Sequence, residues 1–351
     1  MGIYLLGLSL LFIFKMLQVK KKDILIIFSI YYILIAMLRG PSVGMDTRGY
    51  IEDFKKVGNM SWDRMFEFYF PNIGYYIFSK LFYLWGWNYH LLFGFVALIY
   101  IVSFVLIIYK DTQNEMMSIV LFFFLGLFAF SLAGLKQILA MAGFNFTLYF
   151  WRNKKFVWMF VSAIIACFFH ITAIIAMIAL FAFAAFKNKK AQLTVFVVIM
   201  VILIVFRSFL MRELFSLFEQ QNSHYIIYED EEAALSIIGL LVQVSLFVFC
   251  CIFYREDTIG LIFLGFSCCF QYYATGASGV ASMFRIGLYF LNYSCVFISN
   301  AISASFDKER LEINAKSKKK IYEFVIALLF IVYFIISTIN ARNIYPYKFF
   351  F

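Results

Sequence analysis

Long, uninterrupted apolar runs are the feature of this sequence that most restricts its fold. A helix that crosses a bilayer needs about 20 apolar residues, with about 17 as a practical minimum. With 64% hydrophobic and only 14% charged residues, the chain lacks the polar surface of a soluble protein of this size. The runs therefore predict a membrane-embedded protein. They lie near residues 2–18, 24–39, 73–89, 91–109, 116–133, 136–150, 156–186, 191–210, 234–254, 259–274, 280–300 and 321–340.

The runs also decide the kind of membrane fold. Strands of an outer-membrane barrel alternate polar and apolar residues over short segments, and these runs do not alternate. In lipid, a helix satisfies the backbone of such a segment by itself. We therefore predict an all-α fold, a polytopic transmembrane helical bundle with about 10–12 membrane segments. The whole chain, residues 1–351, is expected to form a single integral membrane domain. The first run is followed by Lys20-Lys21-Lys22, so we expect a retained helix and not a cleaved signal peptide.

Clusters of Lys and Arg predict the orientation of the helices. Basic residues hold loops in the cytoplasm, and this explains the net charge of +10 without a nucleic-acid partner. On the opposite side we expect an outer loop at 40–72, a smaller acidic loop at 211–233, and Tyr345-Pro346-Tyr347. The clusters expected in the cytoplasm are Val19–Lys22, Arg152–Lys155, Lys187–Lys190 and Lys316–Lys320.

The first half of the chain does not alternate under this assignment. Between the outer loop at 40–72 and the cluster at 152–155 lie four apolar runs, where an odd number must cross. We predict that the short aromatic run 73–89 dips into the membrane or lies along its interface. The run 156–186 is too long for one span and short for two, so we expect a tight helix pair or a broken helix turning near His170.

The six cysteines all lie within apolar runs, and none makes a CxxC pair. Zinc ligation and a disulfide framework are therefore not expected, and these residues are predicted to be packing residues. We see no metal-binding cluster in the sequence and expect a metal-independent protein without a cofactor.

Ionisable residues within apolar runs carry most of the functional information, because burying each one costs at least about 2.5 kcal/mol on insertion scales. Under the predicted topology several gather near the outer ends of their helices, beside polar residues of the outer loop. Such cations suit a phosphate or diphosphate, which Arg can grip with two hydrogen bonds, and a neutral His can accept a proton. The residues are Arg39, Lys136, Gln137, His170 and Arg285 in the runs, with Asp46, Arg48 and Tyr50 in the loop.

Each of these residues also has a structural interpretation. A lone His in an apolar run is more often a hydrogen-bonded packing residue, Arg39 can snorkel to the interface, and an acid such as Asp46 is common in loops. By the same loop argument, His90 and His224 are expected to be solvated. Arg285 is the hardest to explain without function, since apolar residues flank it on both sides.

Four short motifs, in order along the chain, resemble those of a known family. They are Gly44-Met45-Asp46-Thr47-Arg48-Gly49-Tyr50, similar to Gly-x-Asp followed by Tyr; Leu135-Lys136-Gln137-Ile138-Leu139-Ala140, similar to Leu-Arg-Gln-x-Leu-Ala; Phe169-His170-Ile171-Thr172-Ala173, similar to Phe-His-x-Ser/Thr-Ala; and Tyr345-Pro346-Tyr347, similar to a terminal Pro-Tyr. The family is the EpsG-like family of bacterial polysaccharide polymerases, which includes Wzy-type O-antigen polymerases. Arg285 resembles a further Arg in the family's late helices, though more loosely.

The chain departs from the family pattern at two positions. Lys136 stands where the family usually has Arg, and Lys holds phosphate as a point charge and not as a fork. Asn72-Ile73-Gly74-Tyr75 lacks the carboxylate of the family's Glu-x-Gly-Tyr.

The resemblance implies an enzyme of the bacterial inner membrane, a glycosyltransferase-type polymerase of O-antigen or capsule. It would transfer the growing glycan from undecaprenyl diphosphate to a sugar hydroxyl of an incoming undecaprenyl-diphosphate-linked oligosaccharide, at the periplasmic face. Its partners would be this lipid-linked sugar, membrane lipids and a chain-length regulator protein.

Within that mechanism, Arg285, Lys136 and Arg39 would neutralise the departing diphosphate. His170 would take the proton of the acceptor hydroxyl, with Asp46 as a substitute base or as the group that orients the imidazole. Further substrate contacts would come from Gln137, Arg48 and Tyr50.

Other functions remain open. A flippase for the same lipid-linked sugars would also use a cationic cavity, but it would favour two matching halves with broken helices, and we see no such repeat. An O-antigen ligase or membrane acyltransferase is a second alternative, although a ligase is expected to carry a larger and more basic outer loop than 211–233. A purely structural scaffold would leave the convergence of polar residues unexplained.

Overall fold

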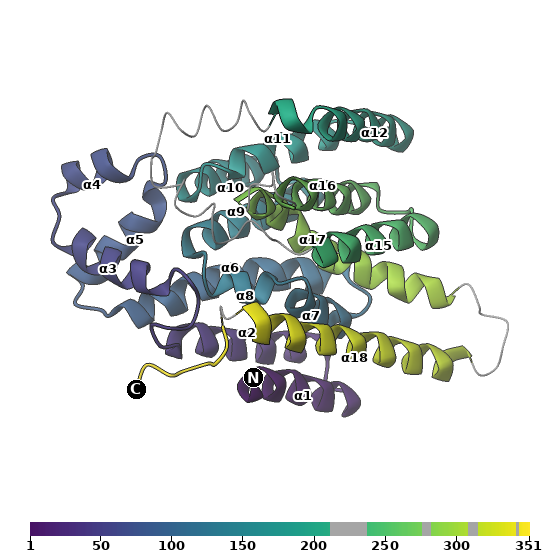
Figure 1. Ribbon diagram of the computed structural model, residues 1–351, viewed down its shortest axis with the longest axis horizontal. Coiled ribbons are helices and arrows are strands. Elements are labelled where there is room, and N and C mark those ends of the chain that lie inside the picture. The colour runs from purple at the N-terminus through teal and green to yellow at the C-terminus, as the bar shows by residue number, and fades with distance from the viewer. Residues whose placement is uncertain (211–236, 276–281, 308–314, 342–343) are drawn as a thin grey trace. The chain divides into compact units, whose positions relative to one another are not determined.

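The structure is a computed structural model that describes residues 1–210, 237–275, 282–307, 315–341 and 344–351. These residues form α-helices, with no strand apart from one β-bridge between Arg39 and Phe349, which confirms the all-α prediction. The helices are α1 (Gly2–Met16), α2 (Lys21–Leu38), α3 (Thr47–Gly58), α4 (Trp62–Tyr69), α5 (Ile73–Leu84), α6 (Tyr89–Asp111), α7 (Glu115–Phe124), α8 (Leu127–Ser131), α9 (Leu135–Arg152), α10 (Phe156–Phe169), α11 (Ala173–Ala184), α12 (Lys189–Val205), α15 (Ile237–Phe253), α16 (Thr258–Ala274), α17 (Ser282–Asp307) and α18 (Ala315–Ala341) (Figure 1).

Three described segments are long and apolar enough to cross a bilayer: Tyr89–Asp111, Met283–Ser305 and Ile321–Ile339. Several shorter apolar helices accompany them, including α1, α10 and α16. This set of helices indicates a multi-pass membrane protein.

The chain divides into two compact units. Unit 1 contains Met1–Ile174 and Phe306–Phe351, and unit 2 contains Ile175–Ser305. Each unit is described by itself. The prediction of a single membrane domain stays a prediction.

Helices α2 and α6 of unit 1 pack side by side in opposite directions. At one end of the pair, His90 Nδ1 lies 3.0 Å from the carbonyl oxygen of Met37. At the other end, Lys21 donates a 2.8 Å hydrogen bond to the carbonyl of Thr112. We call the first of these the Arg39 end of unit 1, after the residue that follows α2, and the second the basic end.

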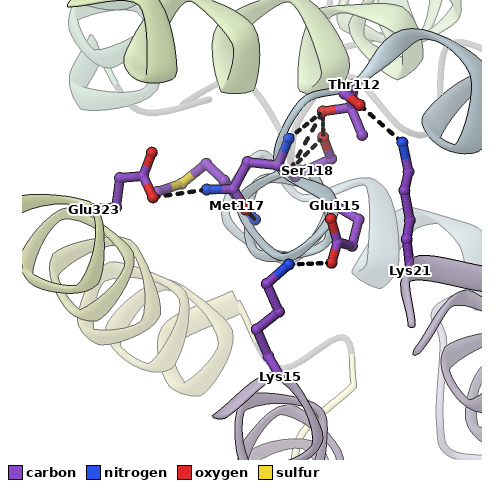
Figure 2. A network of polar contacts seen from close by, with 8 residues as sticks. Lys15, Lys21, Thr112, Glu115, Met117, Ser118 and Glu323 are labelled. Atoms are coloured by element: carbon purple, nitrogen blue, oxygen red, sulfur yellow. Dashed lines mark hydrogen bonds and ion pairs between the residues drawn. The ribbon is translucent and has the colours of Figure 1, made fainter. Parts of the chain in front are cut away.

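Charged side chains at the basic end pair with one another. Lys15 forms an ion pair with Glu115, whose side chain is almost fully buried (Figure 2). Arg152, at the end of α9, pairs with Asp111 at 2.9 Å. The first two basic clusters of the sequence therefore meet at the same end of unit 1, as the predicted orientation requires.

The apolar run 116–133 passes through unit 1 as a broken helix. It begins at the basic end with α7, continues in α8, and brings the carbonyl of Leu132 against Gly44 in the loop after α2. Helix α9 then starts beside that loop and returns to the basic end.

Helix α5 does not pass from one end to the other. It has 12 residues, about 18 Å of helix, which is shorter than the hydrocarbon core of a bilayer. Asn72 before it and Asn88 after it both lie at the Arg39 end, next to Ile171 and at the start of α6. This geometry agrees with the prediction that the run 73–89 does not cross, and an odd number of passes remains between the loop and Arg152.

The run 156–186 forms two helices, α10 and α11, separated at residues 170–172. The predicted turn near His170 is therefore confirmed. Because α10 starts near the basic end, this turn lies at the Arg39 end of unit 1, where it contacts the start of α5.

Unit 2 is built around α16, against which α12 and α15 pack. Phe263 and Phe266 of α16 contact Phe290 of α17 through their rings.

All six cysteines are free, and four of them are buried, in keeping with the predicted packing role. The predicted loop at 211–233 and His224 lie outside the described residues.

Candidate functional site

The loop that follows α2 is fixed against the start of α9. Gly44 has a φ of +89°, and a Cβ there would lie 2.3 Å from the carbonyl oxygen of Leu132. Only glycine tolerates both conditions. Thr47 then starts α3 with its hydroxyl bonded to the carbonyl of Val43 at 2.6 Å. The loop therefore holds α3 beside residues 132–136.

Lys136 opens α9 among tyrosines. Its Nζ donates a 3.0 Å hydrogen bond to the hydroxyl of Tyr76, and it lies 5.8 Å from the ring centre of Tyr50. Its backbone N–H points to the hydroxyl of Tyr50 at 3.4 Å. Tyr50 and Lys136, both predicted site residues, are thus brought together.

Asp53 continues this polar chain. The hydroxyl of Tyr76 donates to Asp53 Oδ2 at 3.3 Å, and the hydroxyl of Tyr69 to Oδ1 at 3.5 Å, while the two rings stack 3.6 Å apart. Burial, reinforced by the Asp53 carboxylate, raises the pKa of Tyr69 to about 12, so it remains a donor at neutral pH. Nothing in the sequence distinguishes Asp53 from the other acids of the loop.

His170 sits half-buried in the turn between α10 and α11. Its Nδ1 lies 2.7 Å from the hydroxyl of Thr172, which orients the ring. The backbone N–H of Ile171 donates to Asn72 Oδ1 at 2.8 Å, so the turn is tied to the start of α5. Tyr76, the partner of Lys136, lies one helical turn after Asn72.

The close contact of α5 with α10 depends on Gly74. A Cβ at this position would lie 2.7 Å from the ring of Phe169 and 3.1 Å from the carbonyl of Phe168. Side chains of α5 therefore reach both the His170 turn and Lys136. Neither Asn72 nor Tyr76 was among the predicted site residues.

Arg39 is completely buried, which argues against a snorkelling side chain. Its Nη1 donates to the carbonyl of Ala36 at 2.8 Å, and its guanidinium lies 4.4 Å from the ring centre of Phe93. Within the described residues, Nε and Nη2 have no hydrogen-bond partner and the side chain has no ion pair. Its electrostatic neighbours are phenols, namely Tyr32, Tyr75, Tyr347 and Tyr50.

The end of α2 is closed by residues from distant parts of the chain. The last four carbonyls of a helix have no partner within it. The carbonyls of Ile35, Ala36, Met37 and Leu38 accept, respectively, from the Tyr347 hydroxyl at 2.9 Å, Arg39 Nη1 at 2.8 Å, His90 Nδ1 at 3.0 Å and the Phe350 N–H at 3.1 Å.

His90 is therefore not solvated, contrary to the sequence-based expectation. It is 7% exposed, and its ring lies against Phe350 with the centroids 3.8 Å apart. Because a carbonyl only accepts, Nδ1 carries the proton of this imidazole.

The remaining predicted residues are less closely connected. Asp46 is half-exposed at the start of α3 and makes no capping hydrogen bond, Arg48 is exposed, and Gln137 is buried. The Thr172 hydroxyl contacts the His170 ring, and a role for Asp46 beside this imidazole stays a prediction. Arg285 belongs to α17 of unit 2, so its role beside the residues of unit 1 stays a prediction.

At the Arg39 end, unit 1 thus combines two cations, an imidazole and a carboxylate that shares Tyr76 with Lys136. These groups are suited to binding an anionic group and to moving a proton. Within the described ranges, no group of three or more His, Cys, Asp or Glu residues is placed to hold a metal ion.

Comparison with known proteins gives one family. The model of the EpsG family matches residues 22–349, and all four motifs and all eight candidate residues lie within this range. No curated protein and no solved structure is significantly similar to the chain.

Proposed function

The chain belongs to the EpsG family, which is linked to polysaccharide biosynthesis, and on this premise we propose that it polymerises lipid-linked oligosaccharide repeat units. The reaction takes place at the periplasmic face of the bacterial inner membrane. In it, the bond between the anomeric carbon of the growing glycan and undecaprenyl diphosphate breaks. A new bond forms from that carbon to a hydroxyl oxygen of the incoming lipid-linked repeat.

One observation carries this proposal, the meeting of Arg39, Lys136 and the His170 turn at one end of unit 1. They come from three separate parts of the sequence, yet the first two have Tyr50 as a common neighbour, and α5 links Lys136 to the turn. The opposite end of unit 1 holds the first two of the Lys and Arg clusters expected in the cytoplasm. A substrate on the outer leaflet would therefore meet these groups.

Each group has a task in the transfer. The departing diphosphate gains negative charge, and Lys136 and Arg39 stabilise it; the family resemblance assigns the same task to Arg285. The acceptor hydroxyl loses its proton to the imidazole of His170, whose Nδ1 faces the Thr172 hydroxyl. Diphosphate is already a good leaving group, so no ATP enters the reaction.

Other contacts would position the sugars. Tyr50, Gln137 and Arg48 are candidates for sugar and phosphate binding, and Asp46 is a candidate second base in the loop. A chain-length regulator protein would act as a partner in the membrane.

The proposal is tested in a strain from which this gene is deleted, complemented with His170→Ala, Lys136→Ala or Arg285→Ala. We expect each variant to insert in the membrane and to leave surface glycan of one repeat unit. A flippase variant would leave no repeat at all, and full-length chains from all three variants would contradict the proposed site.

A further inference from the structure

The proposed function does not explain why Arg39 is completely buried or why a later segment of the chain lies across the end of α2 beside it. Residues 344–351, which we call the strap, run across the end of α2. Gly40 donates to the carbonyl of Lys348 at 2.7 Å, and Phe350 donates to the carbonyl of Leu38 at 3.1 Å. Arg39 and Phe349 form the single β-bridge of the described chain.

Tyr347 of the strap is an electrostatic neighbour of the Arg39 guanidinium. This tyrosine donates to the carbonyl of Ile35 and contacts Tyr4 ring to ring at 5.7 Å. Burial raises the pKa of Tyr347 to about 12, so it is uncharged at neutral pH and does not balance the cation.

A buried cation without a counter-ion is costly, and it is usually paired with a carboxylate. Arg39 has no ion pair in the part of the chain that the structure describes, and two of its nitrogens lack an acceptor. The hydroxyl of Tyr75, an electrostatic neighbour of Arg39, is also buried and without a partner there. Three hydrogen-bond donors next to one positive charge form a site for an anion.

We propose that Arg39 and Tyr75 form a phosphoryl-binding subsite that the strap closes, and that the strap must move aside to admit a phosphate group. The inference rests on the proposed function only for the natural source of that group, the diphosphate of the lipid-linked sugar. The anion itself is recognised by the guanidinium Nε and Nη2 and by the phenol, whatever carries it.

The test is saturation binding of radiolabelled inorganic pyrophosphate to the purified full-length protein in detergent micelles. Tyr75→Phe removes only a hydroxyl that has no partner in the described part of the chain, so folding should be unaffected, while pyrophosphate affinity should fall about fivefold to tenfold. Arg39→Gln should abolish saturable binding, and Arg64→Gln, an exposed arginine of α4, is the matched control that should bind as the unaltered protein does.

Tyr347→Phe tests the strap. It removes one hydrogen bond that holds the strap closed, so pyrophosphate should bind about fivefold more tightly, because the open form becomes more populated. Unchanged or weaker binding would contradict closure by the strap. Equal binding by Tyr75→Phe, Arg39→Gln and Arg64→Gln would overturn the subsite.

Micelles doped with undecaprenyl phosphate distinguish the source of the phosphate. Competition with pyrophosphate identifies a lipid headgroup as a ligand, and its absence identifies a soluble phosphate. The proposed function fails separately, if Arg39→Gln abolishes pyrophosphate binding but leaves polymer length unchanged in cells. The subsite fails alone if polymer is lost while pyrophosphate binding persists.

Discussion

At the basic end of unit 1, cations lie against carboxylates of the chain itself, Lys15 against Glu115 and Arg152 against Asp111. At the Arg39 end, Arg39 lies among phenols and an aromatic ring, and Lys136 donates to a tyrosine. Charges that neutralise one another stabilise a fold, whereas Arg39, which has no ion pair among the described residues, is available to an external anion. The two ends therefore have different roles.

Two buried cations of unit 1, Lys80 and Arg39, show the same difference in how their charges are used. Lys80 of α5 donates to the carbonyls of Val57, Gly58 and Met60 at the end of α3 and lies 5.2 Å from the ring centre of Trp62. It closes the C-terminus of a helix, where cations are favoured. Arg39 donates to one carbonyl, and its Nε and Nη2 have no acceptor among the residues that the structure describes. We therefore expect Lys80 to stabilise the fold and Arg39 to serve the proposed function.

The largest difference in polymer formation is expected when one lysine at each end is replaced by alanine. Lys136→Ala should reduce polymer formation about 100-fold or more, the usual loss when a group that stabilises a developing charge is removed. Lys15→Ala should leave polymer formation per molecule of protein within about twofold, because Lys15 neutralises a carboxylate of the chain itself at the end opposite the candidate site. Gel patterns of surface glycan, normalised to protein level, measure both. Equal losses of polymer formation in the two variants would contradict the idea that the two ends of unit 1 have different roles.

Lys80→Met should destabilise the protein by about 3 kcal/mol, because it leaves buried carbonyls of α3 without a donor. Thermal unfolding in detergent measures the change, and Lys55→Met, on the exposed face of α3, is the control. A melting temperature equal to that of the control would show that Lys80 is not structural.

Gly74→Ala should cost about 1–3 kcal/mol, because the added methyl group forces α5 away from Phe169. Polymer formation should fall with it, since α5 links the His170 turn to Lys136. The matched control is Gly49→Ala, where a Cβ meets nothing within 4 Å. Activity as high in the first variant as in the second would mean that the α5–α10 contact has no functional role.

The smallest effect is expected for Asp53→Asn. The amide keeps the shape but weakens the hydrogen bonds from Tyr69 and Tyr76 by about 1 kcal/mol, so polymer formation should fall a few-fold. Glu52→Gln, the exposed neighbour, should have no effect. Equal polymer formation by the two variants would show that the hydrogen bond from Tyr76 to Asp53 does not contribute to the function of Lys136.

Much of the fold was accessible from the sequence, because bilayer thickness relates run length to helix number. The helix break at His170 was predicted from the length of the run 156–186. That the run 73–89 does not cross was predicted because an odd number of spans must separate the outer loop from the basic cluster at 152–155. The break between α7 and α8 did not, since residues 116–133 are apolar throughout and the break is seen only in the backbone at Gly126.

The candidate site was accessible only where polar residues interrupt apolar runs, as at Arg39, Lys136 and His170. Tyr75 and Tyr76 lie in an aromatic stretch where nothing distinguishes them, and Asp53 is one acid among several in the loop. His90 was predicted to be solvated, because its partner, the carbonyl of Met37, is a backbone group 53 residues away that the sequence does not reveal. Spacing along the chain does not reveal such contacts.

The most direct test of the account asks which side of the membrane each end of unit 1 faces. Single cysteines placed at Ser42, exposed in the loop after α2, and at Lys154, exposed after α9, are treated with a membrane-impermeant thiol reagent in intact spheroplasts. The account predicts that the cysteine at 42 is labelled at once and the one at 154 only after permeabilisation. Labelling of both from the outside, or of the second alone, would contradict it.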